Sequence, residues 1–139
     1  MVCACIDIGT NTTRLLVAEP GPDGLREVLA QRVFTRVRRA QGPDGRIAAG
    51  KLAELVDVVA SQARAARALG CAQVHAVATA AIRDAPNRDD LVAALRGAAG
   101  VELQVLSAEE EARMAFCGAV GALRHPPDGA IAVVDLGGG

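Results

Sequence analysis

Two aspartates in this sequence each follow a short apolar segment and precede a turn that contains glycine. A polar, glycine-containing turn presents backbone N–H groups beside hydroxyl and amide side chains, a combination that suits a phosphate group. The two carboxylates could hold a hard cation such as Mg²⁺ against the phosphate oxygens. Asp-x-Gly is also an ordinary turn sequence. The presence of two such turns therefore indicates a phosphate site more strongly than either turn does alone. The residues of this predicted site are Asp7 with Gly9, Thr10, Asn11 and Thr12, and Asp135 with Gly137, Gly138 and Gly139.

Hydrolysis of a phosphoanhydride also needs positive charge on the phosphate and a base for the attacking water. The base candidates are three consecutive acids, Glu109 to Glu111. Glu110 is explained by a capping box with Ser107, and helical periodicity does not separate Glu109 from Glu111. Acids are favoured in a first helical turn by the macrodipole alone. Arg83 is the candidate for the positive charge, with a surface residue at a helix start as the ordinary alternative.

The elements that would position these residues follow from hydrophobic periodicity. In chain order we predict a hairpin over 3–18, a third strand over 25–37, a helix over 51–69, a strand over 72–78, a short helix capped by Asn87, a strand over 101–106, a helix over 107–123 and a strand over 130–134. This order predicts an α/β fold with a mixed five-stranded sheet that opens with three antiparallel strands and carries helices on its faces. If the first, fourth and fifth strands are parallel, Asp7, Arg83 and the three glutamates lie at one edge of the sheet.

Composition narrows the possible partners. The net charge of the 139 residues is −1, which gives no electrostatic reason to expect a nucleic-acid or membrane partner. No apolar run reaches the roughly 18 residues of a membrane span, and the first residues lack the charged start of a signal peptide, so we predict a cytoplasmic protein. The four cysteines have no CxxC spacing and the two histidines are distant from each other, so we expect buried, reduced thiols.

Arginines gather on and after the predicted third strand. Arg32, Arg36 and Arg38 would alternate onto one strand face, and Arg39 follows. The ordinary interpretation is a solvated strand face. The alternative is a basic rim that contacts a polyanion.

Four segments of the chain resemble those of exopolyphosphatases and guanosine pentaphosphate phosphohydrolases, within the actin-like ATPase superfamily. They are IDIGTNTTRLLVA at 6–18, VATAAIRDAPNRD at 77–89, VLSAEEEARMAFCGAV at 105–120 and VVDLGGG at 133–139. The resemblance implies a ribonuclease H-like (actin-like) lobe over residues 1–127. It also implies that residues 128–139 are the first strand and phosphate loop of a second, truncated lobe.

The resemblance also implies roles for single residues. The first phosphate loop falls on Asp7 and residues 9–12, and the second on Asp135 and residues 137–139, with the two aspartates as Mg²⁺ ligands. Arg83 falls on the phosphate-binding arginine, and Glu111 on the glutamate taken as the catalytic base. Three departures from the family pattern are Thr12 in place of serine, Ala108 in place of glycine, and an altered turn over 37–42.

Taken together, these features predict the N-terminal part of a phosphohydrolase that releases terminal phosphate from inorganic polyphosphate or guanosine pentaphosphate with Mg²⁺. We expect the isolated chain to be inactive, because its cleft lacks a second wall, and the full-length protein to be a homodimer. Two alternatives remain open. One is the ATP-binding lobe of an actin-like kinase or ATPase, which would use the same two loops, and the other is a noncatalytic phosphate-binding module.

Overall fold

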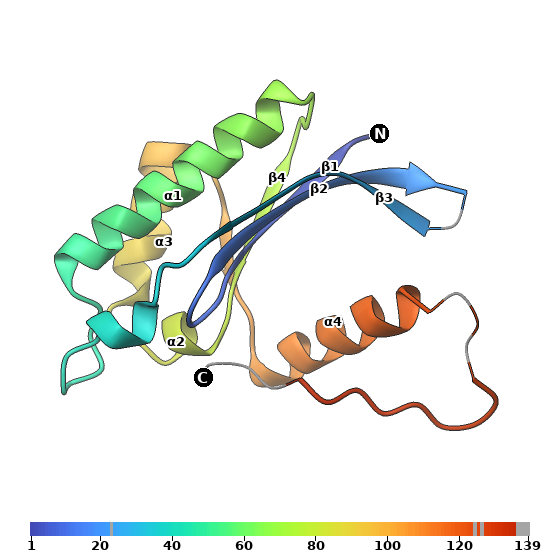
Figure 1. Ribbon diagram of the computed structural model, residues 1–139. Coiled ribbons are helices and arrows are strands. Elements are labelled where there is room, and N and C mark those ends of the chain that lie inside the picture. Colours follow the sequence, from blue (N-terminus) through green and yellow to red (C-terminus); the bar gives the residue numbers. More distant parts are fainter. Residues whose placement is uncertain (23, 124, 126, 136–139) are drawn as a thin grey trace.

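The computed structural model describes residues 1–22, 24–123, 125 and 127–135, which form one mixed sheet with helices on both sides (Figure 1). Its strands are β1 (Cys3–Ile8), β2 (Thr13–Gly21), β3 (Gly24–Val33), β4 (Val74–Ala78) and β5 (Leu103–Val105). Its helices are the 3₁₀ helix η1 (Val37–Ala40), α1 (Ala49–Ala68), α2 (Ala80–Arg83), α3 (Arg88–Ala99) and α4 (Ala108–Gly121).

The strand order is β3-β2-β1-β4-β5. Strand β1 pairs antiparallel with β2, and β2 pairs antiparallel with β3. Strand β1 also pairs parallel with β4, which pairs parallel with β5. The predicted sheet is therefore confirmed, and the carboxyl ends of its three parallel strands share one edge.

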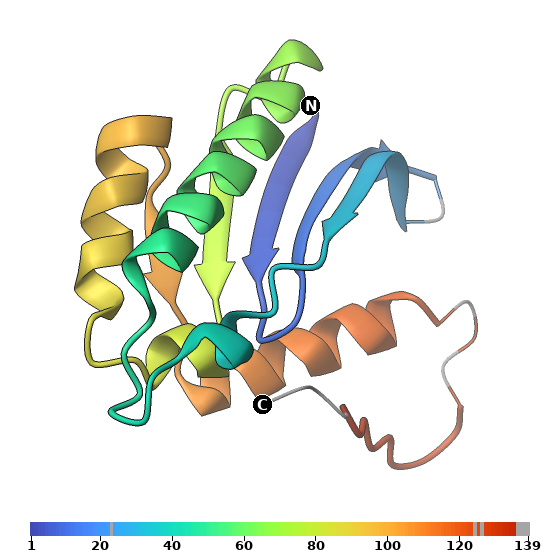
Figure 2. The ribbon, with the colours of Figure 1, turned by 60° about the vertical axis from the view of Figure 1, so that its left-hand side comes forward.

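Helices α1 and α3 pack against each other and cover one face of the sheet (Figures 1 and 2). Alternation along β1 places Ala4, Ile6 and Ile8 in the core beneath them, each at most 2% exposed. Burial of one large aliphatic side chain stabilises a fold by about 1.5–3 kcal/mol, so this face fixes the register of β1. Asp7 has the opposite parity and lies on the other face.

Helix α4 lies on the side of the sheet opposite to α1 and α3 (Figure 1). Its start is as predicted, because the Glu110 backbone N–H donates to the Ser107 hydroxyl and the Ser107 N–H donates to the Glu110 carboxylate. The other described elements do not cover its apolar side chains. None of the described α4 residues is buried, and Phe116 is 41% exposed.

The predicted third strand is four residues too long. Strand β3 ends at Val33, because the Thr35 side chain turns inward and shares a 3.1 Å hydrogen bond with the Thr13 hydroxyl. Arg36 then adopts a left-handed conformation, with φ 47° and ψ 49°, and η1 begins. The sequence predicted that Arg36 and Arg38 share a strand face with Arg32. This prediction is wrong, because the strand ends before both residues.

Two further predictions are wrong in the structure. Residues 130–134 form no strand, since an extended segment needs a neighbouring strand to pair with. Asn87 precedes α3 but its side chain does not cap that helix. The Asn87 amide is buried and instead bonds both the N–H and the carbonyl of Ile47, at 2.9 and 3.0 Å.

The cysteines are free, but the expectation of burial holds for Cys71 alone. Cys3 and Cys5 are exposed on the sheet face that α1 and α3 leave open, and Cys117 is exposed on α4. Within the described ranges, no helix combines the length and apolar character needed to cross a bilayer.

Candidate functional site

Three predicted site residues meet at the carboxyl edge of the sheet. Asp7 is the penultimate residue of β1, Arg83 ends the short helix that follows β4, and Glu111 lies in the first turn of the helix that follows β5. The parallel pairing of β1, β4 and β5 produces this convergence. The prediction that these side chains share one edge is confirmed.

Arg83 and Glu111 form the best-defined contact of the site. The Arg83 Nη1 donates to Glu111 Oε2 at 2.8 Å and to the Leu106 carbonyl at 3.1 Å. The two side chains are 23% and 34% exposed, so the pair is partly shielded yet open to solvent. Within the described part of the chain, Arg83 Nη2 makes no hydrogen bond and remains available to a ligand.

Asp7 combines partial burial with an unpaired oxygen. Its Oδ1 is buried and has no hydrogen-bond partner among the described residues. Desolvation raises the pKa of the Asp7 carboxyl above its ordinary value, the guanidinium of Arg14 opposes that shift, and the negative charges of Glu111 and Asp135 add to it. A buried carboxylate oxygen near two further acids favours a bound cation.

The predicted first phosphate loop is a tight turn between β1 and β2. The Gly9 N–H donates to the Thr12 carbonyl at 2.9 Å, so this donor is used within the turn. In the described residues, the backbone N–H groups of Thr10, Asn11 and Thr12 make no hydrogen bond. These three groups are the ones that the turn offers to an anion.

Most of the second predicted loop lies outside the described residues. Asp135 is close enough for its charge to affect Asp7, whereas Gly137, Gly138 and Gly139 lie outside the described residues. The described residues contain no group of three His, Cys, Asp or Glu side chains that could form a complete metal site. Mg²⁺ is commonly held by one or two carboxylates together with substrate phosphates and water, and Asp7 with its free Oδ1 fits that form of binding.

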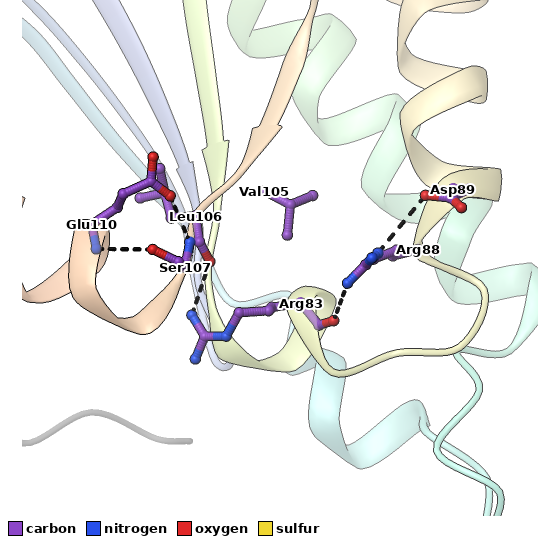
Figure 3. A pocket seen from close by; sticks show the side chains of 7 residues that line it. All are labelled: Arg83, Arg88, Asp89, Val105, Leu106, Ser107 and Glu110. Atoms are coloured by element: carbon purple, nitrogen blue, oxygen red, sulfur yellow. Dashed lines mark hydrogen bonds and ion pairs between the residues drawn. The ribbon is translucent and has the colours of Figure 1, made fainter.

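A pocket of about 400 Å³ adjoins the site on the side of β5 (Figure 3). Arg83 lines it, and Glu110 lies there in its capping box with Ser107. Asp7 and Glu111 are not among its lining residues. The pocket therefore neighbours the acidic centre and shares only the arginine with it.

The structure adds two residues that the sequence had not singled out. Arg14 lies directly opposite Asp7 in the β1–β2 register, and the antiparallel alternation of the hairpin could have predicted this neighbour. The Phe34 ring lies under two guanidiniums, 5.1 Å from that of Arg32 and 5.9 Å from that of Arg36. No local signal marks this contact, because it depends on where β3 ends.

Comparison with known proteins identifies the family. The sequence profile of the Ppx/GppA phosphatase family matches residues 16–139. The chain belongs to the Ppx/GppA phosphatase family. Among family members, it is similar to "Exopolyphosphatase 1" of Mycobacterium tuberculosis, at 35% identity over 135 residues, covering 96% of this chain and 39% of that protein. "Exopolyphosphatase 2" of the same organism is 39% identical over 145 residues, covering 98% of this chain and 45% of that protein.

Solved Ppx/GppA structures have the same fold. The Aquifex aeolicus PPX-GPPA enzyme superposes with a TM-score of 0.84 at 28% identity, covering 93% of this chain and 42% of that one. The actin-like, ribonuclease H-like lobe expected from the sequence is thereby confirmed. The chain spans about two fifths of the length of these Ppx/GppA relatives.

Proposed function

We propose that this chain is the first lobe of a phosphohydrolase that releases terminal phosphate from inorganic polyphosphate. The observation that carries the proposal is the Arg83–Glu111 pair at the edge of the sheet beside Asp7, in a chain of the Ppx/GppA phosphatase family. Relatives named exopolyphosphatases support polyphosphate as the substrate. Guanosine pentaphosphate is the second substrate in the proposal.

In this proposal the residues divide the work of hydrolysis. The loop after β1 binds the terminal phosphate through the N–H groups of residues 10–12, and Arg83 Nη2 binds a phosphate oxygen. Glu111 accepts a proton from the attacking water, and its bond to Arg83 holds the carboxylate in place. Glu109 has no comparable contact in the described residues, which favours Glu111 of the two candidates that periodicity left open.

Asp7 and Asp135 would hold Mg²⁺, with Gly137, Gly138 and Gly139 as the second phosphate loop. The ion would supply positive charge that neutralises phosphate oxygens as the bond breaks. The unpaired Oδ1 of Asp7 supports this part of the proposal. Residues 1–127 would then be the first lobe and 128–139 the beginning of the second.

The test is phosphate release. The full-length protein should release phosphate from polyphosphate in the presence of Mg²⁺, and should lose this activity when the ion is chelated. The 139-residue chain should fold but release little phosphate, because it spans about two fifths of its relatives' length and, in this proposal, supplies only one wall of the cleft. Release at a typical enzymatic rate by the short chain would contradict the two-lobe proposal, and ATP-dependent transfer to an acceptor without polyphosphate hydrolysis would favour a kinase instead.

Two further expectations accompany the proposal. We expect the full-length protein to be cytoplasmic and to form a homodimer. Cell fractionation and light scattering on the purified protein test these two points independently of the chemistry.

A further inference from the structure

A row of charged residues crosses the open face of the sheet. Asp7 on β1 lies opposite Arg14 on β2, and Arg14 lies opposite Arg32 on β3. Neighbouring strands are about 4.8 Å apart, so the row leads from the acidic centre to Arg32 in two strand spacings, roughly 10 Å. Positive charge therefore begins immediately beside the site and continues away from it.

A hollow lies between the two arginines of this row. A cavity of about 280 Å³ is lined by consecutive residues of the two strands, Arg14, Leu15 and Leu16 on β2 and Ala30, Gln31 and Arg32 on β3. Leu16 and Ala30 are register partners on β2 and β3. This hollow therefore combines aliphatic side chains of the sheet with two guanidinium groups.

Phe34 orients the outer arginines. Its ring is 59% exposed and has the Arg32 and Arg36 guanidiniums within the distance of a cation–π contact, about 6 Å. A guanidinium that stacks on a ring keeps the N–H donors along its edge free for phosphate oxygens. The aromatic ring therefore limits the motion of two cations without neutralising them.

The backbone connects this cluster to the first phosphate loop. Arg36 is the one non-glycine residue with positive φ in the described chain, and its N–H donates to the Asn11 carbonyl at 3.0 Å. A left-handed arginine is uncommon and persists where its surroundings hold it. The position of Arg36 is thereby fixed relative to the loop that is proposed to bind the terminal phosphate.

The two arginines at Phe34 lack acidic partners among the described residues, whereas Arg14 has Asp7 as its neighbour on β1. Among the described residues, Arg14, Arg32 and Arg36 form no salt bridge, whereas Arg26, further along β3, pairs with Glu19. A solvated strand face would be expected to mix the two signs of charge, as the Arg26 end does. Arg32 and Arg36 therefore place two guanidiniums without a salt bridge at one aromatic ring, and an anionic ligand would neutralise them.

We propose that Arg14, Arg32, Phe34 and Arg36, the arginine–phenylalanine subsite, bind the part of a linear polyphosphate chain that lies beyond the reacting terminal phosphate. This inference rests on the proposed function and adds a path for the polymer to it. Arg38 and Arg39 lie on η1; among the described residues, neither forms a cation–π pair with Phe34 and neither lines the hollow. Of the four arginines in the basic rim predicted from the sequence, Arg32 and Arg36 therefore belong to the proposed subsite, and Arg38 and Arg39 do not.

The experiment compares long polyphosphate with tripolyphosphate as ligands of the 139-residue chain. The Arg32→Gln/Arg36→Gln double variant should bind long polyphosphate roughly fivefold more weakly or worse, with a much smaller change for tripolyphosphate. Because each phosphate contact contributes about 0.7 to the slope of log affinity against log salt in a single strand, that slope should fall by roughly 1.4. Phe34→Leu, which keeps all charges, should give a smaller but measurable loss.

Arg64→Gln is the matched control, because Arg64 is exposed on α1, which lies on the other side of the sheet from the proposed subsite. Unchanged affinity and slope in the double variant would overturn the subsite, as would an equal loss in Arg64→Gln. If a single-stranded DNA of the same length bound equally well, the subsite would accept any polyanion, and its assignment to polyphosphate would be overturned. Failure of the wild-type chain to bind long polyphosphate would also overturn it, while phosphate release from tripolyphosphate by the full-length protein would show that the proposed function itself still stands.

Discussion

Arg83 Nη1 and Glu111 Oε2 are 2.8 Å apart, although the two residues belong to helices that follow different strands. The same Nη1 also binds the Leu106 carbonyl, so the arginine is held by the strand edge while it orients the glutamate. A phosphate that reaches Arg83 Nη2 would therefore arrive beside Glu111. The proposed base and the proposed phosphate ligand are positioned by one contact.

Replacement of Glu111 by glutamine should remove most turnover in the full-length protein and leave KM for polyphosphate nearly unchanged. General-base catalysis contributes about 10²–10⁴-fold, so kcat should fall within that range. Glu109→Gln is the matched control, because it changes the neighbouring exposed acid and should retain activity. Loss of turnover in Glu109→Gln with normal turnover in Glu111→Gln would reverse the assignment.

Arg83→Lys should restore only part of what Arg83→Ala loses. A guanidinium can donate to Glu111 and to phosphate at once, whereas an ammonium acts as a point charge on a flexible stem. We expect KM to rise and kcat to fall in both variants, as measured by phosphate release. Arg88→Lys, a change at a nearby arginine of the adjoining pocket, should behave like wild type. Full activity in Arg83→Lys would mean that Arg83 supplies charge alone.

Asp7→Asn should stabilise the 139-residue chain in the absence of divalent cations, because Asp7 Oδ1 is buried without a partner and burial of an unpaired charge is costly. We expect the free energy of unfolding to rise by about 1 kcal/mol, which corresponds to an increase of roughly 4 °C in the unfolding temperature of such a domain. Scanning calorimetry should show an increase of that order. Mg²⁺ should raise the unfolding temperature of wild type but not of the variant, and the same Mg²⁺ response in both would remove Asp7 from the ion site.

The capping box at the start of α4 should respond to pH. The hydrogen bond from the Ser107 backbone N–H is the largest cause that lowers the pKa of Glu110. Its stabilising effect is thus fully present above the ordinary glutamate pKa, about 4.3, and is lost as the pH falls through the lowered value. Hydrogen exchange should show weaker protection of the Ser107 amide at low pH, after correction for the intrinsic exchange rate. Glu110→Gln should show no such transition.

Asn87→Ala should destabilise the chain by about 2–4 kcal/mol. The substitution leaves the N–H and the carbonyl of Ile47, a residue only 2% exposed, without their partner. Urea unfolding monitored by circular dichroism measures the change. Asn11→Ala, at an exposed asparagine, is the control and should have little effect on stability, although it should weaken phosphate binding if its amide contacts the ligand.

The sequence was sufficient to predict the chain order of the elements, the mixed five-stranded sheet and the shared edge of Asp7, Arg83 and Glu111, because period-two and helical patterns indicate the elements and parallel strands fix the edge. It was not sufficient for contacts between distant polar groups. Nothing near Asn87 indicates that its amide binds Ile47 rather than the following helix. The end of β3 was missed for a similar reason, since Thr35 turns inward to meet Thr13, a partner 22 residues away.

The exposure of α4 and the absence of a strand at residues 130–134 could not be predicted from the sequence either. Periodicity shows which face of a helix is apolar, but not whether another element covers it. A β-branched run such as 131–134 similarly forms a strand only where a neighbour offers backbone hydrogen bonds. Choosing Glu111 over Glu109 required either the family resemblance or the contact with Arg83.

The connection from β2 to β3 lies at the end of the sheet opposite to the turn at residues 9–12 (Figure 1), because β2 runs antiparallel to β1. Gly21 and Gly24 pair across it, and none of the site residues is nearby in the register. Exposed loop tips of this kind tolerate insertion. A fluorescent label or an affinity tag could therefore be placed between these glycines, which would allow the chain to be immobilised or detected from the end remote from the candidate site.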